Sequence, residues 1–125
     1  MSFVSDEMLR SLPLMSHEQL DALPFGAVML DDAGIIGFYN QYATDLTKVD
    51  PVYAFGKNFF TQIAPSTNNR LVYGVFKEGV KANALNSEIL YTLTYIMRPT
   101  LVNFRLYRDP INKTNWLLVQ RDADQ

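Results

Sequence analysis

The chain has 125 residues, of which 48% are hydrophobic and 19% charged, and its formal net charge is -2. This composition is typical of one globular domain and excludes a disordered chain. No run of Lys or Arg exceeds one residue, so the clustered positive charge that nucleic-acid binding requires is missing. The chain contains no cysteine, which excludes disulfides, thiolate metal sites and cysteine nucleophiles.

The sequence also indicates a cellular location. Asp6 and Glu7 stand where a signal peptide would carry basic residues, and no apolar core follows them. No stretch approaches the roughly 18 apolar residues of a membrane span. We therefore expect a cytoplasmic protein that binds neither a membrane nor a nucleic acid.

The first 24 residues are predicted to form two short helices separated by Pro13. Ser5 is a suitable N-cap for the first helix. Ser16 followed by Gln19 matches a capping box, which favours a second helix start. We interpret residues 1–24 as an N-terminal helical cap and residues 25–125 as the core of the same single domain.

Residues 25–40 predict a β-hairpin, because two apolar runs flank the turn residues Asp31 to Gly34. That turn accounts for the neighbouring carboxylates of Asp31 and Asp32. The pattern then breaks into short pieces, with helix starts at Asp50-Pro51 and at Asn58. Broken segments of this kind often surround a binding pocket.

The second half of the chain predicts one long helix and three strands. The helix covers Arg70–Lys81, with one apolar stripe, and Asn83 would end it. Alternating apolar residues mark the next strand, and two more strands follow. With the hairpin these make five strands, which predicts an α+β domain with an antiparallel sheet. The alternating residues are Ile89, Tyr91, Leu93, Tyr95 and Met97.

Several segments of the chain resemble the photoactive yellow protein family. They are FGAVMLDDAGIIGFYN, GKNFFTQIAP, YGVFKEGV, LNSEILYTLTY and the single Trp116, and the resemblance runs from about Met15 to Arg121. It implies a PAS fold, in which a five-stranded antiparallel sheet and helical connectors enclose a pocket. The two short N-terminal helices precede this fold.

The resemblance further implies that the chromophore site has changed. The family holds a hydroxycinnamoyl group as a thioester on a cysteine after Ala-Pro, whereas Ser66 follows Ala-Pro here. A serine hydroxyl is not nucleophilic without an activating base, and the only histidine, His17, lies in the N-terminal segment. A p-coumaric acid thioester is therefore not possible at Ser66. We expect no catalysis, no metal and no covalent cofactor.

Two family positions at the far end of the chromophore are kept and two are altered. Tyr39 and Thr47 match the family, whereas the glutamate position is Ala43 and the lid arginine position is Val49. The changes at Ala43, Val49 and Ser66 together favour natural divergence over a single engineered substitution. Tyr39 is interpreted either as a ligand contact or as a core residue that bonds Thr47. The candidate ligand-binding residues are Tyr39, Ala43, Thr47, Val49, Ser66, Tyr95 and Met97.

The sequence does not determine what occupies the pocket. An empty volume of ~100 Å³ would cost about 2 to 3 kcal/mol. Either a larger neighbour such as Tyr42 fills the space, or a small aromatic or acyl molecule binds without a covalent bond.

Two functions follow from these alternatives. The first is a non-catalytic PAS sensor or protein-interaction module that forms a homodimer and acts on an unknown protein partner. The second is a non-covalent binding protein for a small aromatic or acyl ligand. The expected dimer contacts are the apolar residues Met8, Leu9, Leu12 and Leu14.

Overall fold

The computed structural model describes residues 3–94 and 99–122, and a five-stranded antiparallel sheet forms its centre. The predicted α+β domain with such a sheet is confirmed. The strand order is β2-β1-β5-β4-β3, so β2 and β3 are the two edges. The strands are β1 (Gly26–Leu30), β2 (Ile36–Tyr39), β3 (Asn86–Leu93), β4 (Thr100–Asp109) and β5 (Thr114–Arg121).

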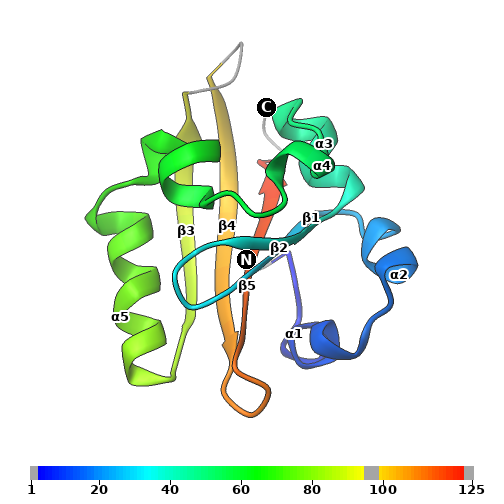
Figure 1. Ribbon diagram of the computed structural model, residues 1–125, viewed down its shortest axis with the longest axis vertical. Helices are drawn as coiled ribbons and strands as arrows, with labels where there is room; N and C mark the ends of the chain where they lie inside the picture. Colours follow the sequence, from blue (N-terminus) through cyan, green and yellow to red (C-terminus); the bar gives the residue numbers. More distant parts are fainter. Residues whose placement is uncertain (1–2, 95–98, 123–125) are drawn as a thin grey trace.

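Helices precede β1 and connect β2 to β3. Figure 1 shows the N-terminal helices at one side of the sheet and α5 at the opposite side, beside β3. The N-terminal elements are α1 (Asp6–Ser11), the 3₁₀ turn η1 (Leu12–Leu14) and α2 (His17–Asp21). The connector contains α3 (Gln41–Thr47), α4 (Pro51–Ala54), the π-helix η2 (Phe59–Ile63), the 3₁₀ turn η3 (Pro65–Thr67), the π-helix η4 (Arg70–Gly74) and α5 (Val75–Ala82).

The alternation of side chains along the strands produces two separate cores. On the inner face, residues such as Val28, Phe104 and Leu117 pack against the helical connector. On the outer face, Trp116 and Leu118 pack against the N-terminal helices. The sheet is therefore covered on both faces, and the connector side is the one that carries the candidate site.

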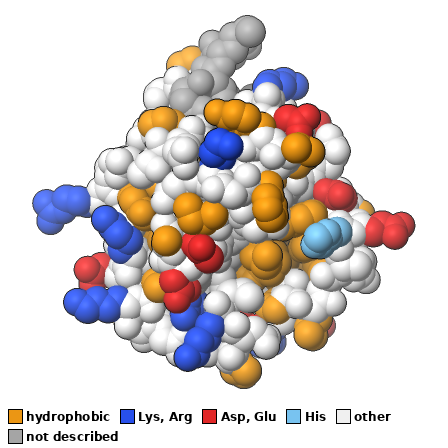
Figure 2. Space-filling view, in the orientation of Figure 1, with side chains coloured by type: hydrophobic (Ala, Val, Ile, Leu, Met, Phe, Trp, Pro, Cys, Tyr) orange, Lys and Arg blue, Asp and Glu red, His pale blue; other side chains and the backbone are white. Residues whose placement is uncertain are grey.

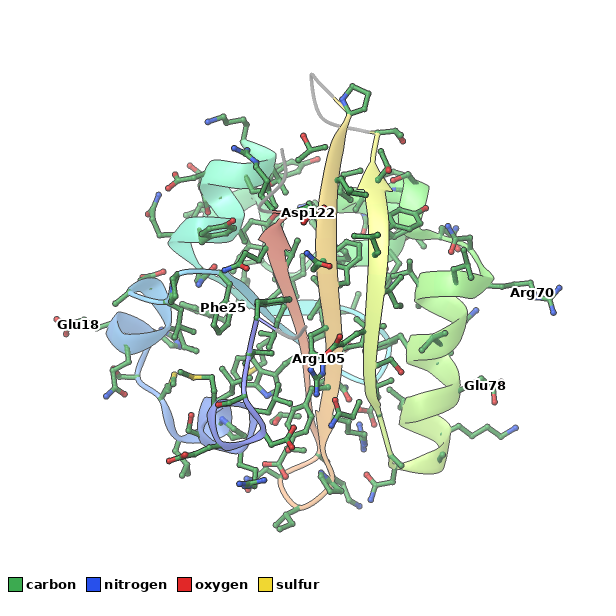
Figure 3. All side chains as sticks on the ribbon, turned by 180° about the vertical axis from the view of Figure 1, so that it is seen from behind. Glu18, Phe25, Arg70, Glu78, Arg105 and Asp122 are labelled. Carbon is green, nitrogen blue, oxygen red and sulfur yellow. The ribbon has the colours of Figure 1, made fainter. Side chains whose placement is uncertain are left out.

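The N-terminal helices form as the capping signals predict, and two of the four expected dimer contacts are buried in them, whereas Leu14 is 83% exposed. The capping box between Ser16 and Gln19 is present. Leu9 and Leu12 are 1% and 0% exposed and belong to the outer core, so they are not available as dimer contacts. Arg105 on β4, labelled in Figure 3, lies 3.6 Å from Asp6 of α1 and adds an ion pair to this contact.

The predicted helix Arg70–Lys81 is only partly correct. Its first turn, Arg70–Gly74, is a π-helix, and α5 begins at Val75. The cause is Asn69, whose side chain accepts from the backbone of Leu71 and Val72 while its carbonyl accepts from Gly74 N, five residues on. The stop at Asn83 is confirmed, since this residue adopts the left-handed conformation with φ of 51°.

The hairpin turn explains Asp31 but not Asp32. Asp31 accepts hydrogen bonds from two backbone amides inside the turn. Asp32 instead forms an ion pair of 2.7 Å with Arg108, whose side chain is 4% exposed. Arg108 also donates to Asn83 and Asn115. Hydrogen bonds from Asn115 and Arg108 hold the pKa of Asp32 below its ordinary value of 3.8.

The surface carries charges of both signs. Figure 2 shows acidic and basic side chains interspersed across one face, without a continuous basic stripe. Among residues 3–94 and 99–122, no three His, Asp or Glu side chains are grouped to hold a metal ion. In the same ranges, no helix has the length and apolar character needed to cross a membrane.

Candidate functional site

The site is built around the junction between β2 and α3. Tyr39 is the last residue of β2, and Asn40 is the N-cap of α3. The Asn40 side chain is fully buried; it accepts from Ala27 N and Ala43 N and donates to the carbonyls of Leu20 and Phe25. This residue fixes the start of α3 against β1 and the N-terminal cap, and so positions the next two turns.

Helix α3 brings Thr47 to Tyr39. The two hydroxyl oxygens lie 2.6 Å apart, and Thr47 Oγ1 also lies 2.8 Å from the carbonyl of Ala43. A threonine hydroxyl has one hydrogen and the carbonyl can only accept, so Thr47 donates to Ala43 and Tyr39 donates to Thr47. The hydrogen bond between Tyr39 and Thr47 that the sequence analysis considered is present, and the Tyr39 oxygen keeps the capacity to accept a further bond.

The surroundings of Tyr39 are apolar. Tyr39 and Ala43 are 4% and 1% exposed, and Val49 packs against the same core from the end of α3. Burial raises the pKa of Tyr39 to about 12, although the hydrogen bond with Thr47 acts in the opposite direction. This end of the site therefore disfavours a charge and holds its phenol protonated.

Ser66 lies in the 3₁₀ turn η3 between the two π-helices. Its carbonyl accepts from the Tyr91 hydroxyl and, at 2.9 Å, from Asn69 Nδ2. Asn69 Nδ2 also donates to the Tyr91 hydroxyl at 2.8 Å. The backbone at Ser66 is thus held from β3 and from the loop that starts η4.

The hydroxyl of Ser66 is buried and has no hydrogen-bond partner within the described part of the chain. The neighbouring Thr67, by contrast, is also buried but donates to Ala64 O at 2.6 Å. Buried hydroxyls are normally satisfied, so Ser66 Oγ is a free polar group enclosed by protein atoms.

The predicted site residues fall into three groups. Tyr39, Ala43 and Val49 share the inner core with Ala64 and Tyr91, which flank Ser66. Thr47 joins them through Tyr39. Tyr95 and Met97 lie outside the described residues.

Tyr42, the residue expected to fill the space beside Ala43, is partly buried and packs against the inner core that contains Ala43. Its hydroxyl accepts from Arg121 N at 3.0 Å, and its ring lines a shallow surface groove with Asp45 and Lys48.

Three contributors to the site were missed by the sequence analysis as functional residues: Asn40, Asn69 and Tyr91. Asn40 and Asn69 each stand directly before a helix, which is the position where Asn serves as an N-cap, and that signal was available. Tyr91 was assigned to the inner face of its strand. Its contact with Ser66 depends on tertiary structure and has no local signal.

Curated relatives decide the family. The chain is 37% identical over 119 residues to photoactive yellow protein of Halochromatium salexigens, covering 95% of each protein. The chain belongs to the photoactive yellow protein family. The corresponding protein of Rhodothalassium salexigens is also 37% identical over 119 residues, again with 95% of each chain covered. No protein-family model matches the chain.

Solved structures agree with this family and with a PAS fold. The photoactive yellow protein domain of the sensor histidine kinase Ppr from Rhodospirillum centenum has a TM-score of 0.84 and 30% identity, over 90% of this chain and 98% of that one. The PAS domain of the quorum-sensing receptor RpfR from Cronobacter turicensis, in complex with BDSF, has a TM-score of 0.64 and 17% identity, over 81% and 96%. The similarity to the RpfR domain is evidence for the fold only.

This member of the photoactive yellow protein family lacks the residue needed for a thioester. The chain contains no cysteine, so no chromophore can be attached to a cysteine sulfur. Chemically, the site offers a free buried hydroxyl at Ser66 and a phenol–hydroxyl pair at Tyr39 and Thr47. These groups can form hydrogen bonds with a bound molecule, but no base is seen to activate Ser66 among the contacts described.

Proposed function

We propose that this chain is a non-catalytic cytoplasmic sensor domain that works without a covalent hydroxycinnamoyl group. It forms a homodimer and passes its signal to a separate protein. Membership of the photoactive yellow protein family and the absence of cysteine support this proposal. The absence of an enzyme activity is supported by the location of His17, which stacks on Phe38 with ring centroids 4.4 Å apart, on the outer side of the sheet.

We further propose that the sensor responds to a small aromatic or acyl molecule, which binds beside Ser66 without a covalent bond. The observation that carries it is the buried, unpartnered Ser66 hydroxyl. Leaving such a group unsatisfied costs about 1 to 3 kcal/mol, and an acceptor atom of a ligand would remove that penalty. The RpfR PAS domain is known in complex with BDSF and with C12:0, which makes an acyl ligand a reasonable class to test.

Native mass spectrometry of the protein purified from its own source tests the ligand proposal. We expect an added mass that disappears on denaturation, because the bond is not covalent. The Ser66→Ala variant should lose this mass or hold it more weakly. The Thr67→Val variant is the matched control, since its hydroxyl is used inside the protein, and it should retain the ligand.

The opposite outcomes are equally clear. If the protein carries no added mass, and if neither hydroxycinnamic acids nor medium-chain fatty acids raise its melting temperature, the ligand proposal is wrong. A mass that survives denaturation would show a covalent adduct and contradict the non-covalent mode. Retention of the ligand in Ser66→Ala would remove Ser66 from the site.

A further inference from the structure

The outer edge of strand β3 is open along its length. β3 is the last strand of the sheet, and among the described residues only β4 pairs with it. Arg108 N donates to Leu85 O at 2.9 Å, which makes this a hydrogen-bonded pair of the antiparallel ladder. Hydrogen-bonded pairs recur at every second residue. The backbone groups that point away from β4 are therefore those of Asn86, Glu88, Leu90 and Thr92.

The sequence and register of β3 lack the usual devices that prevent strand pairing, and α5 lies beside this edge (Figure 1). Such devices are prolines, lysines, bulges and very short strands. β3 has eight residues, contains no proline or lysine, and keeps an unbroken register with β4. Its one charged side chain, Glu88, forms an ion pair of 2.7 Å with Arg105. Leu90, in the middle of the edge, is 61% exposed.

There is also space beside the edge. A groove of about 870 Å³ lies between η4 and α5 on one side and the start of β3 on the other, where Asn86 and Ser87 line it. Small residues of the helical segment, including Gly74 and Ala82, face this groove. Arg70 and Glu78 also line this groove, and their charged ends extend away from β3 (Figure 3).

We propose that the occupant of this edge is β3 of a second copy of the chain, so that two five-stranded sheets join into one. An isologous antiparallel pair requires that each residue face its counterpart symmetrically. Two symmetric registers overlap the strands equally: in one, Asn86 faces Thr92 of the second copy and Glu88 faces Leu90, and in the other, Glu88 faces Thr92 and the two copies of Leu90 face each other. No like charges meet, and both copies of Leu90 become covered.

This inference deepens the homodimer of the proposed function by assigning its contact, and it does not depend on a ligand. It differs from dimerisation through the apolar N-terminal helices, where Leu9 and Leu12 are already buried. Main-chain hydrogen bonds would supply the contact, as in the addition of a strand to an exposed sheet edge.

Analytical ultracentrifugation of the full chain tests the proposal with two substitutions at one position. Leu90→Pro removes an outward N–H without touching the ladder to β4, a position where an edge strand tolerates proline. Leu90→Thr changes the side chain and keeps the N–H. We expect the wild type and Leu90→Thr to dimerise at tens of micromolar, and Leu90→Pro to raise the dissociation constant about tenfold or more.

Other outcomes would overturn the inference. A monomeric wild type at these concentrations, or a Leu90→Pro variant that dimerises normally, excludes pairing through the edge. Loss of the dimer in Leu90→Thr to the same extent as in Leu90→Pro would assign the contact to the sheet face instead. A monomeric Leu90→Pro variant that retains the ligand mass would instead support the edge contact and show that ligand binding does not depend on the dimer.

A second measurement covers the case in which Leu90→Pro does not fold. Amide hydrogen exchange of the wild type is followed by NMR at low and high protein concentration. The outward amides of Glu88, Leu90 and Thr92 should become protected as the concentration rises, while the inward amides of Ile89 and Tyr91 stay protected throughout. Unchanged exchange at the outward amides would exclude the pairing.

Discussion

Replacing Ser66 by alanine is expected to stabilise the ligand-free protein. The Ser66 hydroxyl is buried without a partner, so the substitution removes a desolvated polar group and breaks no hydrogen bond. The bonds to the Ser66 carbonyl from Tyr91 and Asn69 are made to the backbone and remain. The unsatisfied hydroxyl costs about 1 to 3 kcal/mol, and the loss of its packing contacts offsets part of this. We expect a net gain of about 1 kcal/mol.

The neighbouring residue provides the control. Thr67 is also buried, but its hydroxyl donates to Ala64 O at 2.6 Å. Thr67→Val keeps the shape of the side chain and removes this bond. The Ala64 carbonyl retains a bond from Thr67 N, so the expected loss is about 1 kcal/mol rather than more. The two adjacent substitutions should therefore change stability in opposite directions.

Urea denaturation of protein stripped of any ligand measures both effects, with the slope against urea as a check on two-state behaviour. The reasoning about Ser66 is refuted if Ser66→Ala lowers the free energy of unfolding as Thr67→Val does. That result would mean that the hydroxyl has a partner. With ligand bound, the advantage of Ser66→Ala should shrink or reverse, because the wild-type hydroxyl is then satisfied.

Three further predictions follow from the packing and the titrating groups. Asp32→Asn should lower stability at pH 7 by about 1 to 2 kcal/mol, because it removes a charge partner of buried Arg108. The pKa of Asp32 is depressed in the folded state. The wild type is therefore more stable than the variant above pH 3.8, and this difference in the free energy of unfolding is lost as the pH falls through the lower pKa of the folded protein. Denaturation measured from pH 7 to pH 2 tests this. Burial raises the pKa of Tyr39 to about 12 and also raises the pKa of Tyr107, so an absorbance titration should show late-ionising tyrosine, and stability should fall as the pH rises from 10 towards 12; a full set of tyrosines ionising near pH 10 in the folded protein would contradict this. Gly79→Ala should destabilise by about 1 to 3 kcal/mol in thermal unfolding, because an added Cβ would lie 2.6 Å from the side chain of Leu85; a neutral result would mean that Leu85 moves aside freely.

Local patterns were sufficient to predict most of the fold. The capping box at Ser16, the hairpin turn at Asp31 and the helix stop at Asn83 each depend on residues close in the sequence, and each is confirmed. The π-helical turn after Asn69 was missed because helical periodicity does not distinguish an i→i+5 turn from an ordinary one over five residues.

The candidate site was predictable only in part. The pair of Tyr39 and Thr47 lies within nine residues and was anticipated. The contact of Tyr91 with Ser66 joins positions 25 residues apart, and the ion pair of Asp32 with Arg108 joins positions 76 apart. Such pairs depend on how strands and loops meet in space, which residue spacing does not encode.

The buried amide of Asn40 has a consequence for the cooperativity of the domain. One side chain joins the N-terminal cap, through the carbonyl of Leu20, and the segment before β1, through the carbonyl of Phe25, to the first turn of α3, through Ala43 N. An aspartate at this position would keep the two accepting contacts and lose both donating ones. Opening of α3 therefore loosens the cap at the same time, and the two segments should exchange their amide hydrogens as one unit rather than as independent helices.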